Sequence, residues 1–169
     1  MIRPVKAGDA VSIATIYNYY IKNTVITFEE IPVSINEIGK RIREIGAKYP
    51  WLVWEESGAV TGYAYADAWK ERSAYRRAAE LSIYIKPDFQ GKGIGRALFS
   101  RVLEEVRKTG IHALVSGITL PNEASVALHE KFGFKNIACF NEIGFKSGKW
   151  LDVGYWELIL PPDGTEAPD

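Results

Sequence analysis

The sequence has very little cysteine and histidine. Its 169 residues include one cysteine, Cys139, and two histidines, His112 and His129. A single cysteine excludes an intramolecular disulfide and a zinc site built from several thiolates, and two separated histidines leave little material for another metal centre. We therefore expect a chain without a metal, in which Cys139 is a small buried residue rather than a nucleophile.

Long apolar runs and an excess of one charge are also missing. No segment approaches the roughly 18 consecutive apolar residues of a membrane span, and the first residues lack the apolar stretch of a secretory signal. The 21 basic and 21 acidic side chains give a formal net charge of zero. This balance argues against nucleic acid or an anionic membrane as a partner, because both select a concentrated positive surface. We expect a cytoplasmic protein.

The remaining composition is that of one globular domain. Apolar side chains make up 47% of the chain and charged ones 25%. A chain of roughly 100–200 residues normally forms a single domain around one core. We expect this domain to span residues 1–160 and interpret residues 161–169 as a disordered tail.

Apolar spacing predicts where helices and strands lie. Side chains that recur every three or four residues indicate amphipathic helices, the first two capped by Asp9 and Ser34. The expected helices run from Asp9 to Ile21, from Ser34 to before Pro50, from Ile94 to Val106 and from about Asn122 to Phe132. The expected strands are one ending near Val5, then Trp51–Glu55, Val60–Ala68, Ala79–Ile85, Ala113–Ile118 and two around the turn 144–148. The order βααβββαβαββ is that of an α+β fold with a mixed sheet.

A glycine-rich loop joins the strand that ends at Ile85 to the next helix. It reads Gln90-Gly91-Lys92-Gly93-Ile94-Gly95-Arg96. Glycines at alternate positions let the backbone approach a ligand closely, and the helix that follows directs unpaired amides and its positive end at the same point. This arrangement suits a phosphate, although a plain connecting turn is the alternative at this stage.

Two common phosphate loops do not fit these residues. A nucleoside-triphosphate loop needs Ser or Thr after its Gly-Lys pair, whereas Gly93 follows Lys92. A dinucleotide fingerprint needs a third glycine where Arg96 stands. Neither of these two classes of phosphate loop accounts for the segment.

The wider pattern resembles the GNAT family of N-acetyltransferases. Gln90, Gly93 and Gly95, placed between a strand and a helix, resemble the acetyl-CoA pyrophosphate loop of that family. Asn122, followed by a helix that ends in residues 130–134, resembles the second half of its cofactor site. The resemblance covers the whole chain and the order of its elements. It implies a central mixed, splayed sheet flanked by helices, with acetyl-CoA as the acetyl donor and no metal.

Four further segments resemble one group within the family, the phosphinothricin and methionine sulfoximine N-acetyltransferases. They are residues 49–53, residues 68–75, the pattern Glu80-x-Ser82-x-Tyr84 and residues 144–154. The resemblance implies transfer of an acetyl group to the α-amine of a small amino-acid analogue such as phosphinothricin, methionine sulfoximine or methionine sulfone. It also implies direct attack without an acyl-enzyme, so that Cys139 has no catalytic role.

The resemblance assigns cofactor contacts to two segments and one further residue. The strand backbone at residues 83–85 would pair with the acetyl and pantetheine arm, the loop would hold the pyrophosphate through backbone amides, and Asn122 would cap a helix and reach the cofactor. The implied cofactor-binding residues are Ile83, Tyr84, Ile85, Gln90, Gly91, Lys92, Gly93, Ile94, Gly95, Arg96 and Asn122.

Two residues are candidates for catalysis. Glu80 lies near the start of a strand, where its carboxylate would accept a proton from the amine; the alternative is a surface carboxylate paired with Arg76 or Arg77. His129 stands where many relatives have a tyrosine that protonates the departing thiolate. An imidazole there would act as that acid, orient the substrate or relay a proton. The alternative is a solvent-facing histidine, and we interpret His112 as exposed.

The expected acceptor site contains one basic and two aromatic side chains. Arg72 offers a fork for an α-carboxylate, and two aromatic side chains could wall the pocket. The expected substrate-binding residues are Phe28, Arg72, Tyr75, Glu80, Leu81 and Ser82. An acetyltransferase for another amine (a protein N-terminus, a polyamine or an antibiotic) and a non-catalytic acyl-CoA sensor are the alternatives. The resemblance and the aromatic residues Trp150, Tyr155 and Trp156 predict a homodimer.

Overall fold

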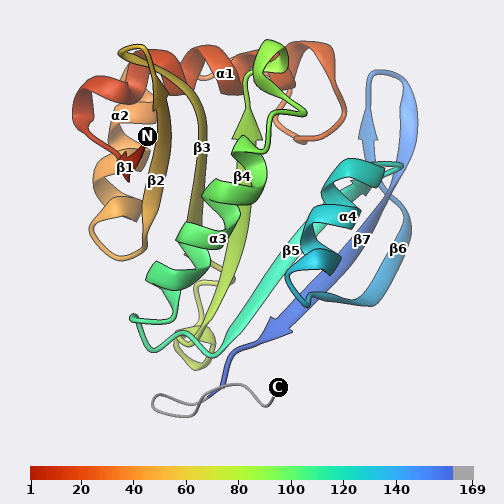
Figure 1. The fold of residues 1–169 in the computed structure, drawn as a ribbon. Helices are drawn as coiled ribbons and strands as arrows, with labels where there is room; N and C mark the ends of the chain where they lie inside the picture. The colour runs from red at the N-terminus through yellow and green to blue at the C-terminus, as the bar shows by residue number, and fades with distance from the viewer. Residues whose placement is uncertain (162–169) are drawn as a thin grey trace.

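The computed structural model describes residues 1–161, so the expected tail lies, apart from its first residue, outside the described residues. The elements follow the expected order βααβββαβαββ (Figure 1). The helices are α1 (Ala10–Asn23), α2 (Ile35–Gly46), α3 (Ile94–Val106) and α4 (Glu123–Lys131). The strands are β1 (Ile2–Pro4), β2 (Trp51–Glu56), β3 (Ala59–Ala68), β4 (Ala78–Ile85), β5 (Ala113–Leu120), β6 (Lys135–Lys146) and β7 (Lys149–Ile159).

The strands form one mixed sheet that opens in the middle. Its order is β1-β2-β3-β4-β5-β7-β6, and β4 and β5 form the parallel pair that the strand–helix–strand connection predicts. These two strands pair only where residues 78–80 face residues 113–115, and beyond that point they diverge. Figure 1 shows β4 leaning toward α1 while β5 continues with β7 and β6. The prediction of a mixed, splayed sheet is confirmed.

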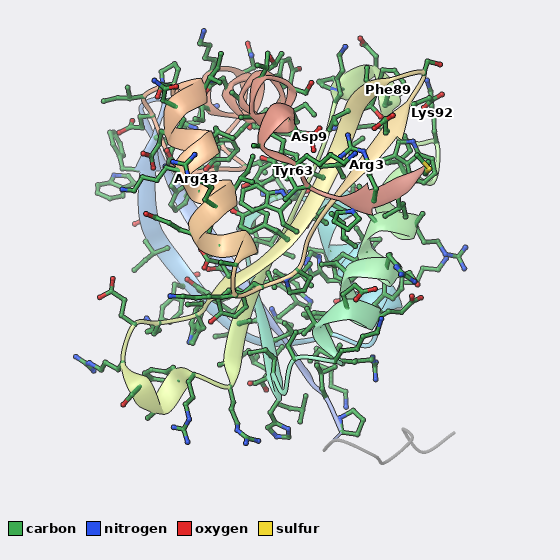
Figure 2. The ribbon with its side chains drawn as sticks, turned by 90° about the vertical axis from the view of Figure 1, so that its left-hand side faces the viewer. Arg3, Asp9, Arg43, Tyr63, Phe89 and Lys92 are labelled. Carbon is green, nitrogen blue, oxygen red and sulfur yellow. The ribbon has the colours of Figure 1, made fainter. Side chains whose placement is uncertain are left out.

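Helices cover both faces of the sheet, and each face has its own core. Helix α3 packs with residues such as Leu81 and Leu114, whereas α1 and α2 pack with Val53 and Tyr63. Figure 2 shows Tyr63 lying between α2 and the sheet. Successive residues of a strand point to opposite faces. On β4, Leu81 belongs to the α3 core, so Glu80 points to the α1–α2 face.

The residues that precede the first two helices, Asp9 and Ser34, use their side chains differently. The side chain of Ser34 accepts a hydrogen bond from the Glu37 amide at 3.1 Å and caps α2 as predicted. Asp9 is the N-cap residue of α1 as predicted, but its side chain makes no capping hydrogen bond to that helix. Its carboxylate accepts hydrogen bonds from the Arg3 guanidinium at 2.8 Å and from the Lys6 amide at 2.7 Å instead. Figure 2 shows Arg3 and Asp9 together near β1. The carboxylate therefore fixes α1 to β1 instead of satisfying the first turn of the helix.

Two expectations about burial fail at the C-terminal strands. Cys139 is exposed rather than buried, and it lies on β6, which has a single strand neighbour within residues 1–161. Trp156, expected to add to an aromatic surface, is buried in the α3 core, whereas Trp150 is exposed. No helix within residues 1–161 is long and apolar enough to cross a membrane.

Candidate active site

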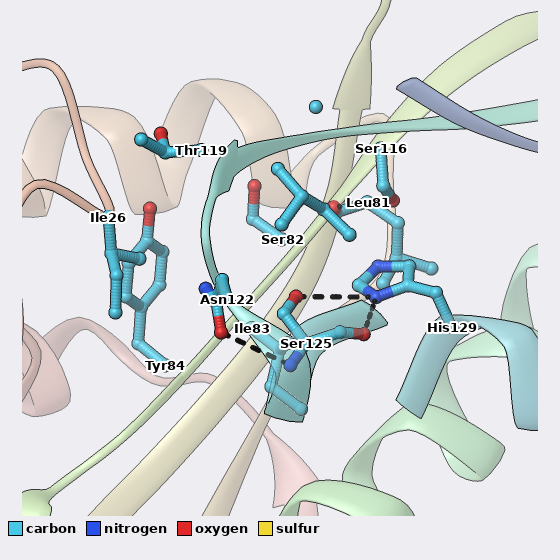
Figure 3. A pocket seen from close by; sticks show the side chains of 12 residues that line it. Ile26, Leu81, Ser82, Ile83, Tyr84, Ser116, Thr119, Asn122, Ser125 and His129 are labelled. Atoms are coloured by element: carbon cyan, nitrogen blue, oxygen red, sulfur yellow. Dashed lines mark hydrogen bonds between the residues drawn. The ribbon is translucent and has the colours of Figure 1, made fainter. Parts of the chain in front are cut away.

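The opening between β4 and β5 forms a narrow slot through the sheet. Its walls are residues 81–84 of β4 and 116–119 of β5, and it is closed by Ile26 and by Asn122, Ser125 and His129 around the start of α4 (Figure 3). From Leu81 onward, one edge of β4 has no strand partner within residues 1–161. The Leu81 carbonyl on this edge accepts a hydrogen bond from Ser116 Oγ at 3.1 Å. Free backbone groups on such an edge can pair with an extended ligand.

A wider groove of about 410 Å³ adjoins the slot and leads to the glycine-rich loop. Its lining includes eight of the predicted cofactor residues: Ile83, Ile85, Gln90, Gly91, Gly93, Gly95, Arg96 and Asn122. Tyr84 lines the slot instead. Lys92 lies outside the lining, with its Nζ 4.6 Å from the centre of the Phe89 ring (Figure 2). Ile94 is buried in the α3 core, so its side chain has a structural role.

The loop conformation depends on two of its glycines. Gly91 has φ of 72° and Gly93 has φ of 80°, a region that other residues rarely adopt. Gly93 immediately precedes α3, and no side chain within residues 1–161 caps that helix. The first amides of α3 therefore remain available at its positive end, where an anionic group binds favourably.

Sequence reasoning missed a residue that braces this loop. Gln90 Nε2 donates a hydrogen bond to the Tyr20 hydroxyl at 2.7 Å, and that hydroxyl donates to the carbonyl of Ile85. Tyr20 lies on α1 and also lines the groove. The apolar spacing of α1 indicated only that Tyr20 faces the core, so no local signal linked it to the loop.

Glu80 lies half-buried at the point where β4 and β5 separate. Its Oε1 is 3.6 Å from the position that a Cβ would take at Gly117, so the glycine leaves room for the carboxylate. Burial raises the pKa of Glu80, and the negative charge of Asp67 raises it further; a hydrogen bond from the Gly117 backbone and the charge of Lys70 partly offset this rise. Among residues 1–161 no ion pair joins Glu80 to an arginine, so the alternative of a surface pair is not found.

His129 is buried on the opposite side of the slot, with 3% of its surface exposed. The alternative of a solvent-facing histidine is therefore wrong. Its Nδ1 lies 2.7 Å from the Ser125 carbonyl, which can only accept, so Nδ1 carries the proton (Figure 3). Its Nε2 is buried without a partner within the described chain. Burial lowers the pKa of His129, which favours the neutral ring with an Nε2 lone pair.

The two candidate catalytic residues thus lie on different faces of the sheet: His129 lines the slot, whereas Glu80 is outside its lining, next to Leu81 at the point where β4 and β5 separate. Glu80 points to the α1–α2 face, whereas the His129 ring packs edge-on against Phe99 and Phe134 of the α3 core at 4.8 and 5.3 Å between ring centres. A reaction in the slot can therefore have one proton-transfer group on each side of the sheet.

The predicted acceptor residues are only partly brought together. Leu81 and Ser82 line the slot. Phe28 lies in the α1–α2 connection with its ring against Gly144, and Ile26 of the same connection lines the slot. Tyr75 and Arg72 are exposed in or beside a short helical turn between β3 and β4, and neither belongs to the slot lining within residues 1–161.

Comparisons with known proteins agree with this geometry. Residues 2–154 match the family described as "Acetyltransferase (GNAT) domain". The chain is 40% identical to the L-amino acid N-acyltransferase MnaT of Escherichia coli (strain K12), over 99% of this chain and 97% of that protein. It is 38% identical to the L-methionine sulfoximine/L-methionine sulfone acetyltransferase of Salmonella typhimurium, over 99% of this chain and 98% of that one.

A solved structure extends the similarity to the fold. The phosphinothricin acetyltransferase of Sinorhizobium meliloti, in complex with AcCoA, superposes with a TM-score of 0.93 at 37% identity. The match covers 100% of this chain and 93% of that chain. With the family match over most of its length, the chain belongs to the GNAT acetyltransferase family and is an acetyl-CoA-dependent N-acetyltransferase.

Proposed function

We propose that this enzyme acetylates the α-amine of a small amino-acid analogue of the phosphinothricin, methionine sulfoximine or methionine sulfone type. The observation that carries the proposal is the slot, with an imidazole nitrogen of His129 in its wall that has no partner within residues 1–161, and the half-buried carboxylate of Glu80 beside it on the other face of the sheet. The acceptors named for the similar enzymes of Salmonella typhimurium and Sinorhizobium meliloti support this substrate class.

The groups around the slot and groove fit acetyl-CoA. When bound, acetyl-CoA supplies its acetyl group as a thioester that an amine can attack directly. The free edge of β4 offers backbone groups to an extended arm, and the first amides of α3 offer donors to a pyrophosphate. Arg96, which lines the groove, adds positive charge beside those amides.

Glu80 is the proposed general base. An α-ammonium group has to lose a proton before its nitrogen can attack, and a carboxylate whose pKa is raised toward neutral pH is better matched to that proton than an exposed one. The proton moves to a Glu80 oxygen directly or through a water. The attack itself then needs no covalent link to the chain.

His129 is the proposed partner on the other face. Because its Nδ1 proton is held by the Ser125 carbonyl, Nε2 presents a lone pair and must gain a proton before it can donate one. This arrangement favours a relay or orienting role for His129 over that of a resting acid. Its buried Nε2 can accept a hydrogen bond from a donor that enters the slot.

The test of the proposed function is thiol release from acetyl-CoA by the purified protein with a panel of acceptors. The panel holds methionine sulfoximine, methionine sulfone, phosphinothricin, a polyamine and a peptide that begins with Ser or Ala. Release with the first three compounds is expected. Release only with the polyamine or peptide would move the function to another amine, and measurable acetyl-CoA binding without any release would favour a sensor.

We also propose that the enzyme is a homodimer in the cytoplasm. Exposed apolar side chains gather on β6 and β7, namely Ile137, Phe140, Ile143, Phe145 and Trp150. Such a patch on an edge strand is suited to pairing with a second copy. A free, exposed thiol at Cys139 fits a reducing compartment. Size-exclusion chromatography with light scattering should give twice the chain mass, and a monomer would remove the dimer from the proposal.

A further inference from the structure

Residues 24–32, which make up most of the connection between α1 and α2, bridge the two halves of the open sheet. We call this segment the strap. Figure 1 shows it extending from α1 toward the tip of the β6–β7 hairpin. Its Ile26 lines both the slot and the groove, and Thr27 is buried. The strap therefore forms part of the site wall, although it has no helix or strand of its own.

Lys146 holds the main chain of the strap from the β6 side. Only 4% of its surface is exposed, and its Nζ donates hydrogen bonds to the carbonyls of Thr27 at 2.6 Å and Glu29 at 3.0 Å. No carboxylate within residues 1–161 forms an ion pair with it. A buried ammonium needs hydrogen-bonding partners, and here backbone carbonyls provide them. Two carbonyls bound to one ammonium fix the backbone around residue 28.

The same strand supports the side chain between those two carbonyls. A Cβ at Gly144 would lie 2.3 Å from Cε2 and Cζ of Phe28, so the ring rests on the glycine. Gly144 and Lys146 are two residues apart and therefore point to one face of β6, where both are buried. Strand β6 thus contacts the strap through its main chain and through the Phe28 ring.

Helix α1 and helix α2 hold the strap from the other side through its side chains. The Tyr17 hydroxyl lies 2.8 Å from Thr27 Oγ1 and donates a hydrogen bond to the Glu29 carboxylate at 2.9 Å. Arg41 on α2 pairs with the same carboxylate at 2.7 Å. The side chains of Thr27 and Glu29 are thus held by the N-terminal half, and their carbonyls by Lys146 of the C-terminal half. Phe28 between them remains 43% exposed.

We propose that Lys146 is a positioning residue for the acceptor, because it sets the distance of the strap, with Ile26 and Phe28, from the slot. The inference rests on the proposed function for the identity of the acceptor. Lys146 takes no part in the proton transfers assigned to Glu80 and His129. It acts through the strap, and the acetyl-CoA loop lies on other elements.

The experiment compares Lys146→Met with the wild type and with Lys135→Met, which changes an exposed lysine of the same strand. Loss of both hydrogen bonds is expected to raise KM for methionine sulfoximine about tenfold and to speed amide hydrogen exchange in residues 26–30. The dissociation constant of acetyl-CoA should change much less, because Ile26 is the only strap residue in the lining of the groove. Lys135→Met should change none of these. Unchanged acceptor KM and unchanged exchange in the strap would overturn the inference, and so would an equal loss of acetyl-CoA affinity.

A second variant protects the test against misfolding of Lys146→Met. Gly144→Ala keeps the lysine but places a methyl group where the Phe28 ring lies, so the ring must move. It should raise the acceptor KM in the same direction without affecting acetyl-CoA binding, and an unchanged KM would count against the inference. If the wild type releases no thiol with any acceptor, the proposed function fails. Hydrogen exchange of the strap in Lys146→Met then still decides whether the lysine fixes it.

Discussion

The two faces of the open sheet are built in different ways. On the α3–α4 side, the groove is formed mainly by one contiguous stretch, from Ile83 to Arg96, together with the start of α4. On the α1–α2 side, Glu80 of β4, the strap and Lys146 of β6 come from three distant parts of the chain. A contiguous loop takes much of its geometry from its own backbone conformation, here with one brace from Tyr20 on α1, whereas a surface assembled from separate segments depends on the contacts between them. The acceptor can therefore change through a few side chains while the cofactor groove stays intact.

The sharpest test of this division is Glu80→Gln, with the largest expected effect. Removing the base should lower kcat by about 10²–10⁴-fold and leave acetyl-CoA affinity unchanged, because the carboxylate lies on the acceptor side. Steady-state kinetics with saturating acceptor and calorimetric titration of acetyl-CoA measure the two quantities. Glu71→Gln, an exposed carboxylate near the end of β3, is the control and should retain kcat.

The same variant has a predicted effect on stability. Burial raises the pKa of Glu80, so ionising this carboxyl group costs folding free energy at pH values above its folded-state pKa. Glu80→Gln should therefore raise Tm at neutral pH, and the gain should vanish as the pH falls below the ordinary carboxyl pKa. In the kinetic test of the preceding paragraph, a wild-type kcat for Glu80→Gln would show that another group takes the proton.

His129→Gln tests the other face and should have a smaller effect. If Nε2 orients a group or relays a proton, its loss should lower kcat about tenfold, the cost of one hydrogen bond, with acetyl-CoA affinity largely kept. His112→Gln, which changes the exposed histidine outside the slot and the groove, is the control and should retain kcat. Loss of acetyl-CoA binding in His129→Gln would instead make this residue part of the cofactor site.

Gly93→Ala should weaken only the cofactor side. Alanine at a φ of 80° is strained by about 1–2 kcal/mol. In the free enzyme the loop would relax to relieve this strain, and acetyl-CoA binding would have to restore the strained conformation. The dissociation constant of acetyl-CoA should rise about tenfold. Gly58→Ala is a matched control, since Gly58 also has φ of 80° and open space around it but lies in the β2–β3 turn. It should lose stability without losing acetyl-CoA affinity, and equal losses of affinity would contradict the loop assignment.

The contrast between the faces also explains what could be predicted from the sequence. The order of elements and the glycine-rich loop follow from local patterns, namely apolar spacing and glycines before a helix, and the structure agrees with both. The partners of Lys146 lie 117 and 119 positions earlier in the chain, so no local pattern could indicate that this lysine is buried. Cys139 was misjudged for a similar reason, because a strand's place at the edge of a sheet depends on the whole topology.

Apolar periodicity also could not predict the direction or the partner of individual polar side chains. The spacing of α4 left open whether His129 points inward, and the structure places it against Phe99. Asp9 stands where a cap is common, but its partner Arg3 comes from β1. Each of these outcomes depends on a neighbouring element that a local pattern does not contain.

The smallest predicted effect is a shift in pH dependence, and its sign tests which group titrates on the acceptor side. Glu80 faces Asp67 across the β3–β4 pair, Lys70 after β3, the Gly117 backbone on β5 and Tyr155 on β7. Because Asp67 raises the pKa of Glu80, Asp67→Asn should move the acidic limb of kcat/KM to lower pH. Lys70→Gln removes a charge that lowers the same pKa, so it should move the limb to higher pH. Opposite shifts in the two variants would assign the acidic limb of the kcat/KM profile to Glu80. If the limb moves in neither variant, it belongs to a group outside this set, and Glu80 is not the general base.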